Sequence, residues 1–428
     1  MISGIVRAVR GPKAGKHEPD WWLLSIVMTL VMIGTVMVFS ASTGMEPGTL
    51  GANAYITRHL IFIALGLGVM SVLTLVDYRI WSSLSLLAIA GTIGLLILVL
   101  LIGDEVYGAR RWFDLGIAQA QPSELAKPAL VVYLASWLCS QGSKLARWDV
   151  GVLQFGAVLS LLVGLVMLEP DMGTSMVLAT IGIGMMFVAG ARKVHAAGLI
   201  VFGGLFFLTL AMSADYRRER ILAFLNPEAN TSDTGWHLLQ ARLALGDGGL
   251  FGVGLGASRQ KFTWLPAPHN DAIFAVIGEE IGIIGAGLVI LLFGLLGYRG
   301  MLIASRSPDR FGMLVAVGIT TWLMFQAMFN IGGVSSAIPF TGITLPFISY
   351  GGSSMIVSLA AIGILLNVSR QTVTMPVPAP APSQSATGQA LAMGTVAQIV
   401  EPTFSTDRFH QHTDIPPGRR TDEWRGEW

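Results

Sequence analysis

The residue types best suited to chemistry in this chain gather at one junction between polar and apolar sequence. The one long polar interval inside an otherwise apolar body runs from Ser213 to Asn270, and Asp271 follows it directly before a long apolar stretch. A carboxylate at that junction, next to a loop rich in arginine, could accept a proton from a hydroxyl group while cations balance a negatively charged leaving group. Asp271 is therefore the candidate catalytic residue. The alternative is that Asp271 only caps the helix that follows it.

Further ionisable residues are predicted on the same side of the apolar body, in loops or at the ends of apolar stretches. The candidate substrate-binding residues are Arg217, Arg218, Arg220, Arg259, Lys261, Arg110, His269, Glu124, Lys127, Glu169 and Asp171. Ionisable side chains near lipid are costly, so they are usually paired or functional. Other roles stay open for several of them. Glu124 and Lys127 are three residues apart on one helix face and can pair with each other, whereas Glu169 and Asp171 can cap a tight turn. The arginines near position 218 can bind lipid headgroups in place of a pyrophosphate.

The elements that must position these residues are predicted to be membrane helices. Apolar residues make up 53% of the chain and charged residues only 12%, with a mean hydropathy of +0.65. A soluble domain of this size needs more charge. The net charge of +1 argues against nucleic acid as a partner. Cys139 is the single cysteine, so no internal disulfide can form.

The apolar stretches predict an all-α polytopic membrane protein. A bilayer core about 30 Å thick requires roughly 20 apolar residues per helix. On that measure we count ten spans, near Trp22 to Ala41, Ile56 to Val76, Ile80 to Ile102, Pro122 to Ser140, Val150 to Leu168, Gly173 to Ala189, Val194 to Met212, Asp271 to Tyr298, Phe311 to Ile331 and Tyr350 to Val368.

The distribution of Lys and Arg predicts the orientation of these spans. The basic N-terminal tail, residues 1–20, lies on the same side as the short basic connections, and the positive-inside rule assigns that side to the cytoplasm. An even number of spans then leaves both termini inside and makes 213–270 a large extracellular loop with interfacial helices. The membrane domain covers 21–370. Residues 371–428 contain a stretch rich in Pro, Ala and Ser and have no apolar periodicity. This composition predicts a disordered cytoplasmic tail.

Several motifs, in a fixed order along the chain, resemble those of one known family. They are Gln121 to Glu124, Glu169 to Thr174, Arg220 to Glu228, Gly249 to Gly256, Leu265 to Asp271 followed by Phe274 to Glu280, and Ile338 to Ser354. Together they are similar to motifs of the SEDS family, which includes FtsW and RodA, over roughly Trp22 to Arg370. The segment Arg217 to Glu228 and the extended tail look more like those of FtsW.

The resemblance implies a peptidoglycan glycosyltransferase of the inner membrane that polymerises lipid II at the division septum, with the family's catalytic aspartate falling on Asp271. It also implies a class B penicillin-binding transpeptidase and other division proteins as partners. The chain departs from the family pattern around this aspartate, because it has Asn270 before it and Ala272 after it where the family usually has Thr and Phe. The departure affects the shape of the pocket.

The expected chemistry follows from an α-linked sugar pyrophosphate donor and a β-1,4-linked product. Inversion in one displacement requires a base for the acceptor 4-hydroxyl group and a stabilised leaving group. Partial burial raises the pKa of a carboxyl group, which suits Asp271 to the role of base. The cations, or a divalent ion such as Mg²⁺ or Mn²⁺, could stabilise the pyrophosphate. A transporter or flippase of the lipid-linked precursor is the alternative function. It predicts charged residues throughout the membrane depth.

Overall fold

The computed structural model describes residues 17–43, 52–106, 109–114, 116, 119–212, 215–225, 234–263 and 268–372. The chain divides into a compact unit, Met1–Thr374, and a second unit, Met375–Trp428, which lies outside the described residues with nearly all of the predicted tail. The predicted tail boundary at Gln371 is slightly early. Gln371 is buried, and its Oε1 accepts a hydrogen bond of 2.7 Å from Arg79.

Each of the ten predicted spans is helical in the described part of the chain. The helices are α2 (Trp21–Ser42), α3 (Ala52–Leu75), α4 (Arg79–Ile102), α5 (Pro122–Gln141), α6 (Phe155–Leu168), α7 (Met172–Val188), α8 (Lys193–Met212), α12 (Ile273–Ser305), α13 (Arg310–Val334) and α14 (Gly352–Ser369). Six of these described helices, α2, α3, α4, α12, α13 and α14, are long and apolar enough to cross a membrane, and α6, α7 and α8 contain shorter apolar segments. The all-α membrane class is confirmed, whereas the count of ten crossings stays a prediction.

Three of these helices begin at an aspartate that accepts a backbone hydrogen bond. Asp20 caps α2 by accepting from Leu23 N at 3.0 Å, and Asp309 caps α13 by accepting from Gly312 N at 2.7 Å. Asp171 caps α7 in the same way. A helix leaves its first N–H groups without partners, so a carboxylate at this position satisfies one of them.

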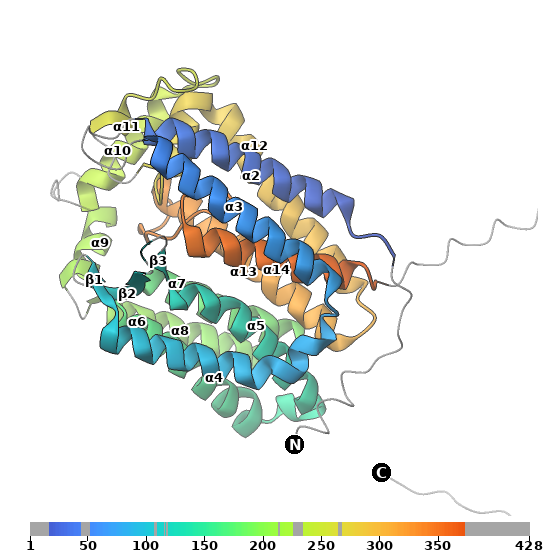
Figure 1. Cartoon of the computed structure of the whole chain (residues 1–428). Helices are drawn as coiled ribbons and strands as arrows, with labels where there is room; N and C mark the ends of the chain where they lie inside the picture. Colours follow the sequence, from blue (N-terminus) through green and yellow to red (C-terminus); the bar gives the residue numbers. More distant parts are fainter. Residues whose placement is uncertain are drawn as a thin grey trace, which may run out of the picture. The chain divides into compact units, whose positions relative to one another are not determined.

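The helices pack around α13, which contacts α12, α7, α5 and α14. In Figure 1, α2, α3 and α12 lie on one side of α13 and α14, and α4 to α8 lie on the other. The consecutive helices α3 and α4 are joined by a short turn at Asp77, yet α3 packs mainly on α14 and α4 mainly on α5. They therefore separate from each other with distance from the turn (Figure 1).

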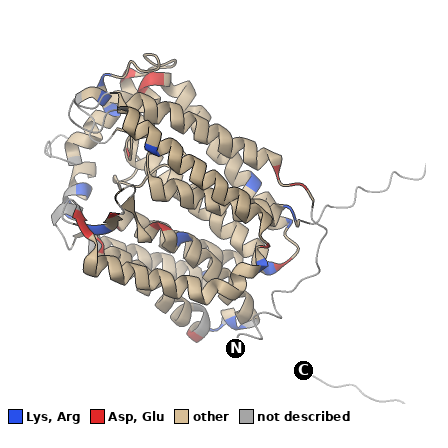
Figure 2. Cartoon of the chain, in the orientation of Figure 1, with Lys and Arg blue, Asp and Glu red and all other residues tan. Residues whose placement is uncertain are grey.

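Charged residues concentrate toward the two ends of the helices, and most of the helix length between the ends carries other residues (Figure 2). At the end that holds the α3–α4 turn, the Arg79 guanidinium pairs with Asp309 at 2.8 Å and that of Arg299 pairs with Asp20. We call this the clasp end. These pairs tie the start of α2 to α12 and the start of α4 to the start of α13.

The opposite end, here called the site end, carries the connections that are not spans. It has the short helices α9 (Asp215–Leu225), α10 (Thr234–Asp247) and α11 (Gln260–Thr263) and a small antiparallel sheet of β1 (Asp104–Val106), β2 (Ala109–Asp114) and β3 (Gln119–Ala120). The helix α9 was expected from the pattern of the loop. The sheet was not expected, because its strands are too short to give a period-2 signal.

Candidate active site

Asp271 lies in a turn that several hydrogen bonds attach to the site end of the bundle. Its backbone carbonyl oxygen accepts a bond of 2.8 Å from the Asn330 side chain on α13, which also donates to the carbonyl oxygen of Ile343 at 2.6 Å. The hydroxyl group of Ser349 donates to the carbonyl oxygen of Asn270 at 2.8 Å. These bonds fix the turn against α13 and the segment before α14.

The structure does not give Asp271 the role of a helix cap. The residue directly before α12 is Ala272, and no side chain caps that helix by a hydrogen bond. Asp271 as a whole residue is half-buried. Burial raises its pKa to about 7, with a further upward contribution from Asp171, while Arg220 and then Arg111 act in the opposite direction. A carboxyl group with a pKa near neutrality is well matched to general-base chemistry.

Gly342 marks the place where Asp271 and Arg220 meet. A Cβ atom added to Gly342 would lie 3.3 Å from Oδ2 of Asp271 and 3.8 Å from Nη1 of Arg220. The same Nη1 donates to the carbonyl oxygen of Thr341 at 3.3 Å. The backbone of Gly342 has φ of 68°, a conformation that favours glycine. The absence of a side chain here leaves room beside the carboxylate and the guanidinium.

A second acidic group lies at the corner between α6 and α7. The Asp171 side chain accepts hydrogen bonds from Thr174 N at 2.9 Å and from Nε2 of Gln121 at 3.1 Å. The Glu169 side chain is fully buried, and neither of its carboxyl oxygens has a hydrogen-bond partner among the described residues. Burial, followed by the charge of Asp171, raises the pKa of Glu169 to about 8, against the effect of Arg111. Glu169 is therefore mostly protonated at neutral pH.

The cation that contacts this corner is Arg111, which is not among the predicted site residues. Its Nε and Nη2 donate to the carbonyl oxygens of Glu169 and Pro170, each at 2.7 Å. Arg110, the predicted candidate, is exposed and lies 3.7 Å from Glu105. Adjacent residues on a strand point to opposite faces. Two adjacent arginines on a strand place one side chain toward the helix bundle and one toward solvent. The sequence alone does not show which of Arg110 and Arg111 faces the bundle.

Lys261, a predicted substrate-binding residue, lies in a buried ion pair. Its Nζ donates to Glu280 on α12 at 2.8 Å, to Ser40 on α2 at 3.0 Å and to the carbonyl oxygen of Gly256 at 2.8 Å. These three acceptors use the three N–H donors of the ammonium group. The structure therefore corrects the prediction, because Lys261 fastens the loop to α2 and α12 and has no donor left for a pyrophosphate.

Glu124 and Lys127 are also predicted to bind substrate. In the structure they form a buried ion pair with each other, which is the alternative role named above. Nζ of Lys127 donates to Glu124 at 2.7 Å and to Oε1 of Gln326 at 2.9 Å. Nε2 of Gln326 in turn donates to the carbonyl oxygen of Thr344 at 3.0 Å. This network supports the segment that carries Gly342, so the structure gives the pair a positioning role.

His269 packs between two aromatic rings. The ring centroids of Tyr55 and Tyr350 lie 5.1 and 5.6 Å from its own, in edge-on contacts. Burial lowers the pKa of His269 to about 4, so the ring is neutral and cannot serve as a cation for phosphate. Arg218 and Arg259 are exposed on the site end.

Two predictions are not decided by these contacts. The Arg217 side chain lies outside the described part of the chain, so its predicted role stays open. In the described residues, no three His, Cys, Asp or Glu side chains converge as a metal ion would require. The predicted role of a divalent ion at the pyrophosphate of the substrate stays open, because Mg²⁺ commonly takes one or two carboxylates together with substrate phosphates.

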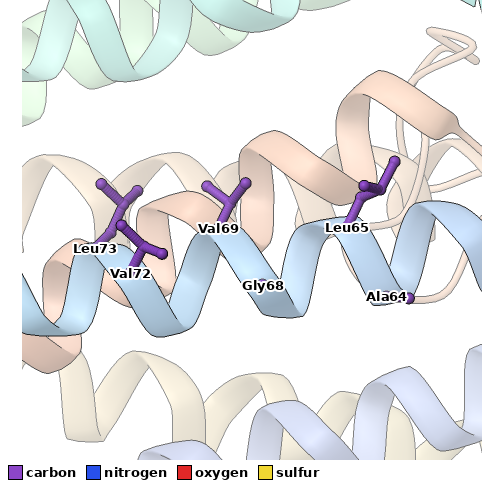
Figure 3. Close-up of a pocket in the computed structure, with 6 residues that line it drawn as sticks. All are labelled: Ala64, Leu65, Gly68, Val69, Val72 and Leu73. Atoms are coloured by element: carbon purple, nitrogen blue, oxygen red, sulfur yellow. The ribbon is translucent and has the colours of Figure 1, made fainter.

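An apolar groove lies on the half of α3 that leads to the turn at Asp77. Its volume is about 500 Å³, and it is lined by Ala64, Leu65, Gly68, Val69, Val72 and Leu73. The labelled side chains Leu65, Val69 and Leu73 extend from the same side of α3 (Figure 3). A second groove of about 240 Å³ lies nearer the active site, with Leu95, Leu125, Gln121 and Ile356 in its wall.

The buried Glu169 predicts a pH effect on stability. A carboxyl group whose pKa is raised by folding contributes stability at low pH and loses it as pH rises from the unfolded pKa, near 4.5, through the folded pKa, near 8. The melting temperature of the detergent-solubilised protein should therefore fall over this range. Glu169→Gln, which keeps the size and cannot ionise, should reduce the fall. Asp271 contributes in the same direction, so the comparison is made between Asp271→Asn and Asp271→Asn/Glu169→Gln. Identical pH curves for these two variants would contradict the assignment.

The fold and the site define a multi-pass helical membrane protein with a carboxylate–arginine site at one end of its helices. Comparison with known proteins shows to which family the chain belongs. The FtsW/RodA/SpoVE family of cell cycle proteins matches residues 20–374. Stage V sporulation protein E of Bacillus subtilis is 42% identical over 359 residues, covering 83% of this chain and 98% of that protein. A protein of Geobacter metallireducens named probable peptidoglycan glycosyltransferase FtsW is 39% identical over 360 residues, covering 83% and 96%.

Solved structures agree with the sequence relatives. The rod shape determining protein RodA of Thermus thermophilus superimposes with a TM-score of 0.63 at 31% identity, covering 83% of this chain and 98% of RodA. A chain from a study of polymerisation and crosslinking by a peptidoglycan synthase complex gives a TM-score of 0.70 at 31% identity, covering 82% and 98%. The chain therefore belongs to the FtsW/RodA/SpoVE family, the SEDS family of peptidoglycan glycosyltransferases that its motifs resemble.

Proposed function

We propose that this protein polymerises lipid II into β-1,4-linked glycan strands, with Asp271 as the general base. The observation that carries the proposal is the position of the Asp271 carboxyl group, which has a pKa near 7 and meets the Arg220 guanidinium beside the open backbone of Gly342. A base near its pKa and a cation at one point match the two needs of an inverting sugar transfer.

The reaction is a single displacement at the anomeric carbon of the donor. The 4-hydroxyl oxygen of the acceptor N-acetylglucosamine attacks this carbon and forms the new β-linked C–O bond, while Asp271 takes the hydroxyl proton. The bond between the anomeric carbon and the pyrophosphate oxygen breaks, and the polyprenyl pyrophosphate leaves with the electron pair. Arg220 stabilises the negative charge that develops on the leaving group. Arg111 holds the backbone of the neighbouring Glu169–Pro170 corner.

The proposed setting is the outer face of the bacterial inner membrane, with both termini in the cytoplasm. Lipid II carries its sugars on a long polyprenyl chain, so an enzyme for it needs a polar site next to apolar surface. The groove beside α14 provides apolar surface next to Gln121, whose side chain bonds Asp171 at the site end. This arrangement supports placement of the site end at the external membrane–water boundary.

The proposed biological role is septal cell-wall synthesis together with a class B penicillin-binding transpeptidase and other division proteins. Two observations support it. Several relatives carry the name FtsW, and a structural neighbour comes from a complex that joins polymerisation to crosslinking. The partner would supply the crosslinks that a glycan polymerase cannot make.

One reconstitution separates this function from the transporter alternative. The purified protein, alone and with its transpeptidase, is placed in vesicles with fluorescent lipid II. We expect glycan ladders on a denaturing gel when the partner is present and no acceleration of lipid II crossing between leaflets. Faster crossing without any ladder would favour the flippase and overturn the proposal.

A further inference from the structure

The helix α12 is broken at Gly282, and a glycine-rich loop fills the break. The backbone of Gly282 has φ of 76° and ψ of −171°, so the first part of the helix ends at Ile281 and the second part starts at Ile283. A residue with a side chain would be strained in this conformation. The loop, residues 248–256, lies between α10 and α11 in the chain and is here called the glycine loop. Both of these helices lie at the site end (Figure 1).

Backbone hydrogen bonds join the glycine loop to both sides of the break. The N–H group of Val253 donates to the carbonyl oxygen of Glu279 at 2.9 Å, and the N–H group of Ile284 donates to the carbonyl oxygen of Leu250 at 3.3 Å. A second bond of the same direction lies beside each of them. A Cβ atom added to Gly252 would overlap the backbone of α12, so the loop can lie this close to the helix only with glycine there. The loop therefore provides partners for helix-end groups that the break leaves open.

Two helices show how deep in the membrane this break lies. On α2, the exposed Trp21 and Trp22 mark the boundary at the clasp end, because tryptophan is enriched at membrane interfaces. Ser40, whose hydroxyl group bonds a side chain of α12 near the break, lies about 28 Å along α2 from Trp21. On α12, Ile283 lies about 24 Å from Arg299, which is paired at the clasp end. A hydrocarbon core is about 30 Å thick, and a tilt of the helices only reduces these depths. The break and the glycine loop therefore lie near the boundary of the core on the site side.

The glycine loop exposes large apolar side chains at this depth. Phe251 is 80% exposed, and Leu250 and Leu255 are 62% and 64% exposed. The loop itself contains no ionisable and no polar side chain. The apolar surface continues on α12, where Ile284 and Leu288 are also exposed. Exposed apolar surface of this extent marks a site of contact with a membrane or another apolar partner.

We propose that the glycine loop is inserted into the membrane leaflet on the site side, with the side chains of Leu250, Phe251 and Leu255 among the acyl chains. Irregular backbone is tolerated at membrane depth only where its polar groups are satisfied, and the bonds to α12 meet this condition. Inserted apolar side chains hold such a segment at the interface in proportion to the area that they bury. The inference goes beyond the proposed function, because it does not depend on which reaction the site performs.

Insertion of the loop would also set the height of the catalytic turn at the membrane. The loop is bonded to α12 at Glu279, eight residues after Asp271. The first part of α12, which starts directly after the turn, is therefore fastened to a segment that lies in lipid. This gives the site end an anchor of its own, separate from the clasp end.

The apolar segment of a partner protein is the competing occupant of this surface. Lipid is favoured because the exposed surface is continuous with the outward face of a membrane span. It is also favoured because the loop offers no polar side chain, whereas protein interfaces combine apolar contacts with hydrogen bonds.

The single cysteine of the chain allows a direct test by spin labelling. Cys139→Ala removes the native thiol, and one nitroxide is then attached at Phe251→Cys, Leu255→Cys, Leu288→Cys or Asp247→Cys. Position 288 on α12 is the lipid reference, and position 247 at the exposed end of α10 is the water reference. Each full-length protein is placed in phosphatidylcholine nanodiscs, and electron paramagnetic resonance measures the access of oxygen, which concentrates in lipid, and of a water-soluble nickel chelate.

We expect the ratio of oxygen access to nickel access at positions 251 and 255 to exceed that at position 247 by about fivefold or more. It should lie within about twofold of the ratio at position 288. A charge in the leaflet is costly, so Phe251→Glu should lower the ratio measured at position 255 by about threefold or more. Phe251→Leu, the matched control, keeps an apolar side chain and should leave that ratio unchanged.

Four outcomes would overturn the proposal. A ratio at positions 251 and 255 equal to that at position 247 would place the loop in water. Labels shielded from both reagents in the protein alone would place the loop inside the protein. Labels that lose access to both reagents only when the transpeptidase is present would assign the surface to a protein partner. An equal ratio at position 255 for Phe251→Glu and Phe251→Leu would show that Phe251 does not hold the loop in lipid.

Discussion

Asp271→Asn should reduce the rate of glycan polymerisation by about 10²- to 10⁴-fold, the usual contribution of a positioned general base. Asparagine keeps the size of the side chain and cannot accept the proton of the acceptor hydroxyl group. The backbone carbonyl oxygen of residue 271, which accepts from Asn330, is unchanged by the substitution. The turn should therefore keep its position, and the loss should appear in kcat with lipid II as substrate.

The matched control for this prediction is Asp247→Asn, since Asp247 is exposed at the end of α10. It should keep activity within about twofold, because surface substitutions usually have small effects. Both variants are compared by melting temperature and by co-purification with the transpeptidase, so that misfolding or lost assembly is detected. If Asp271→Asn polymerised lipid II at the wild-type rate, Asp271 would not be the base.

Lys127→Met should be the most destabilising of the charge substitutions considered. Lys127 is fully buried, and its removal leaves the buried Glu124 carboxylate without a cation and Oε1 of Gln326 with one donor fewer. Breaking a buried ion pair by removing one partner costs about 3–5 kcal/mol. Thermal unfolding in detergent should show a large fall in melting temperature. Activity should fall as well, because Gln326 also holds the backbone at Thr344.

The double variant Glu124→Gln/Lys127→Met tests the cause of this loss. Neutralising the orphaned carboxylate removes the uncompensated charge, so most of the lost stability should return. If the double variant were as unstable as Lys127→Met alone, lost packing of the lysine chain would explain the effect and the ion pair would not.

The apolar helices and the place of Asp271 at one end of them could be predicted from the sequence because each leaves a local signal. An apolar run of spanning length predicts a helix wherever it occurs, and the change from polar to apolar sequence at Asp271 predicts a residue at a membrane boundary. Among the candidate cations, which the sequence alone could not rank, the Arg220 guanidinium lies beside Asp271.

The partners of the other charged residues depend on contacts between distant segments, which one sequence does not reveal. Lys261 resembled a free loop cation, yet Glu280 and Ser40 lie 19 and 221 positions away in the chain and enclose it. The roles of Arg110 and Arg111 could not be distinguished without knowing that both lie on β2, where adjacent side chains point to opposite faces.

The pH dependence of kcat/KM for lipid II polymerisation tests the assignment of Asp271 most directly. A base must be deprotonated to act, so the wild-type enzyme with its transpeptidase should gain activity tenfold per pH unit at low pH and level off above an apparent pKa near 7. A rate independent of pH between about 5 and 8, with polymerisation intact, would contradict the account.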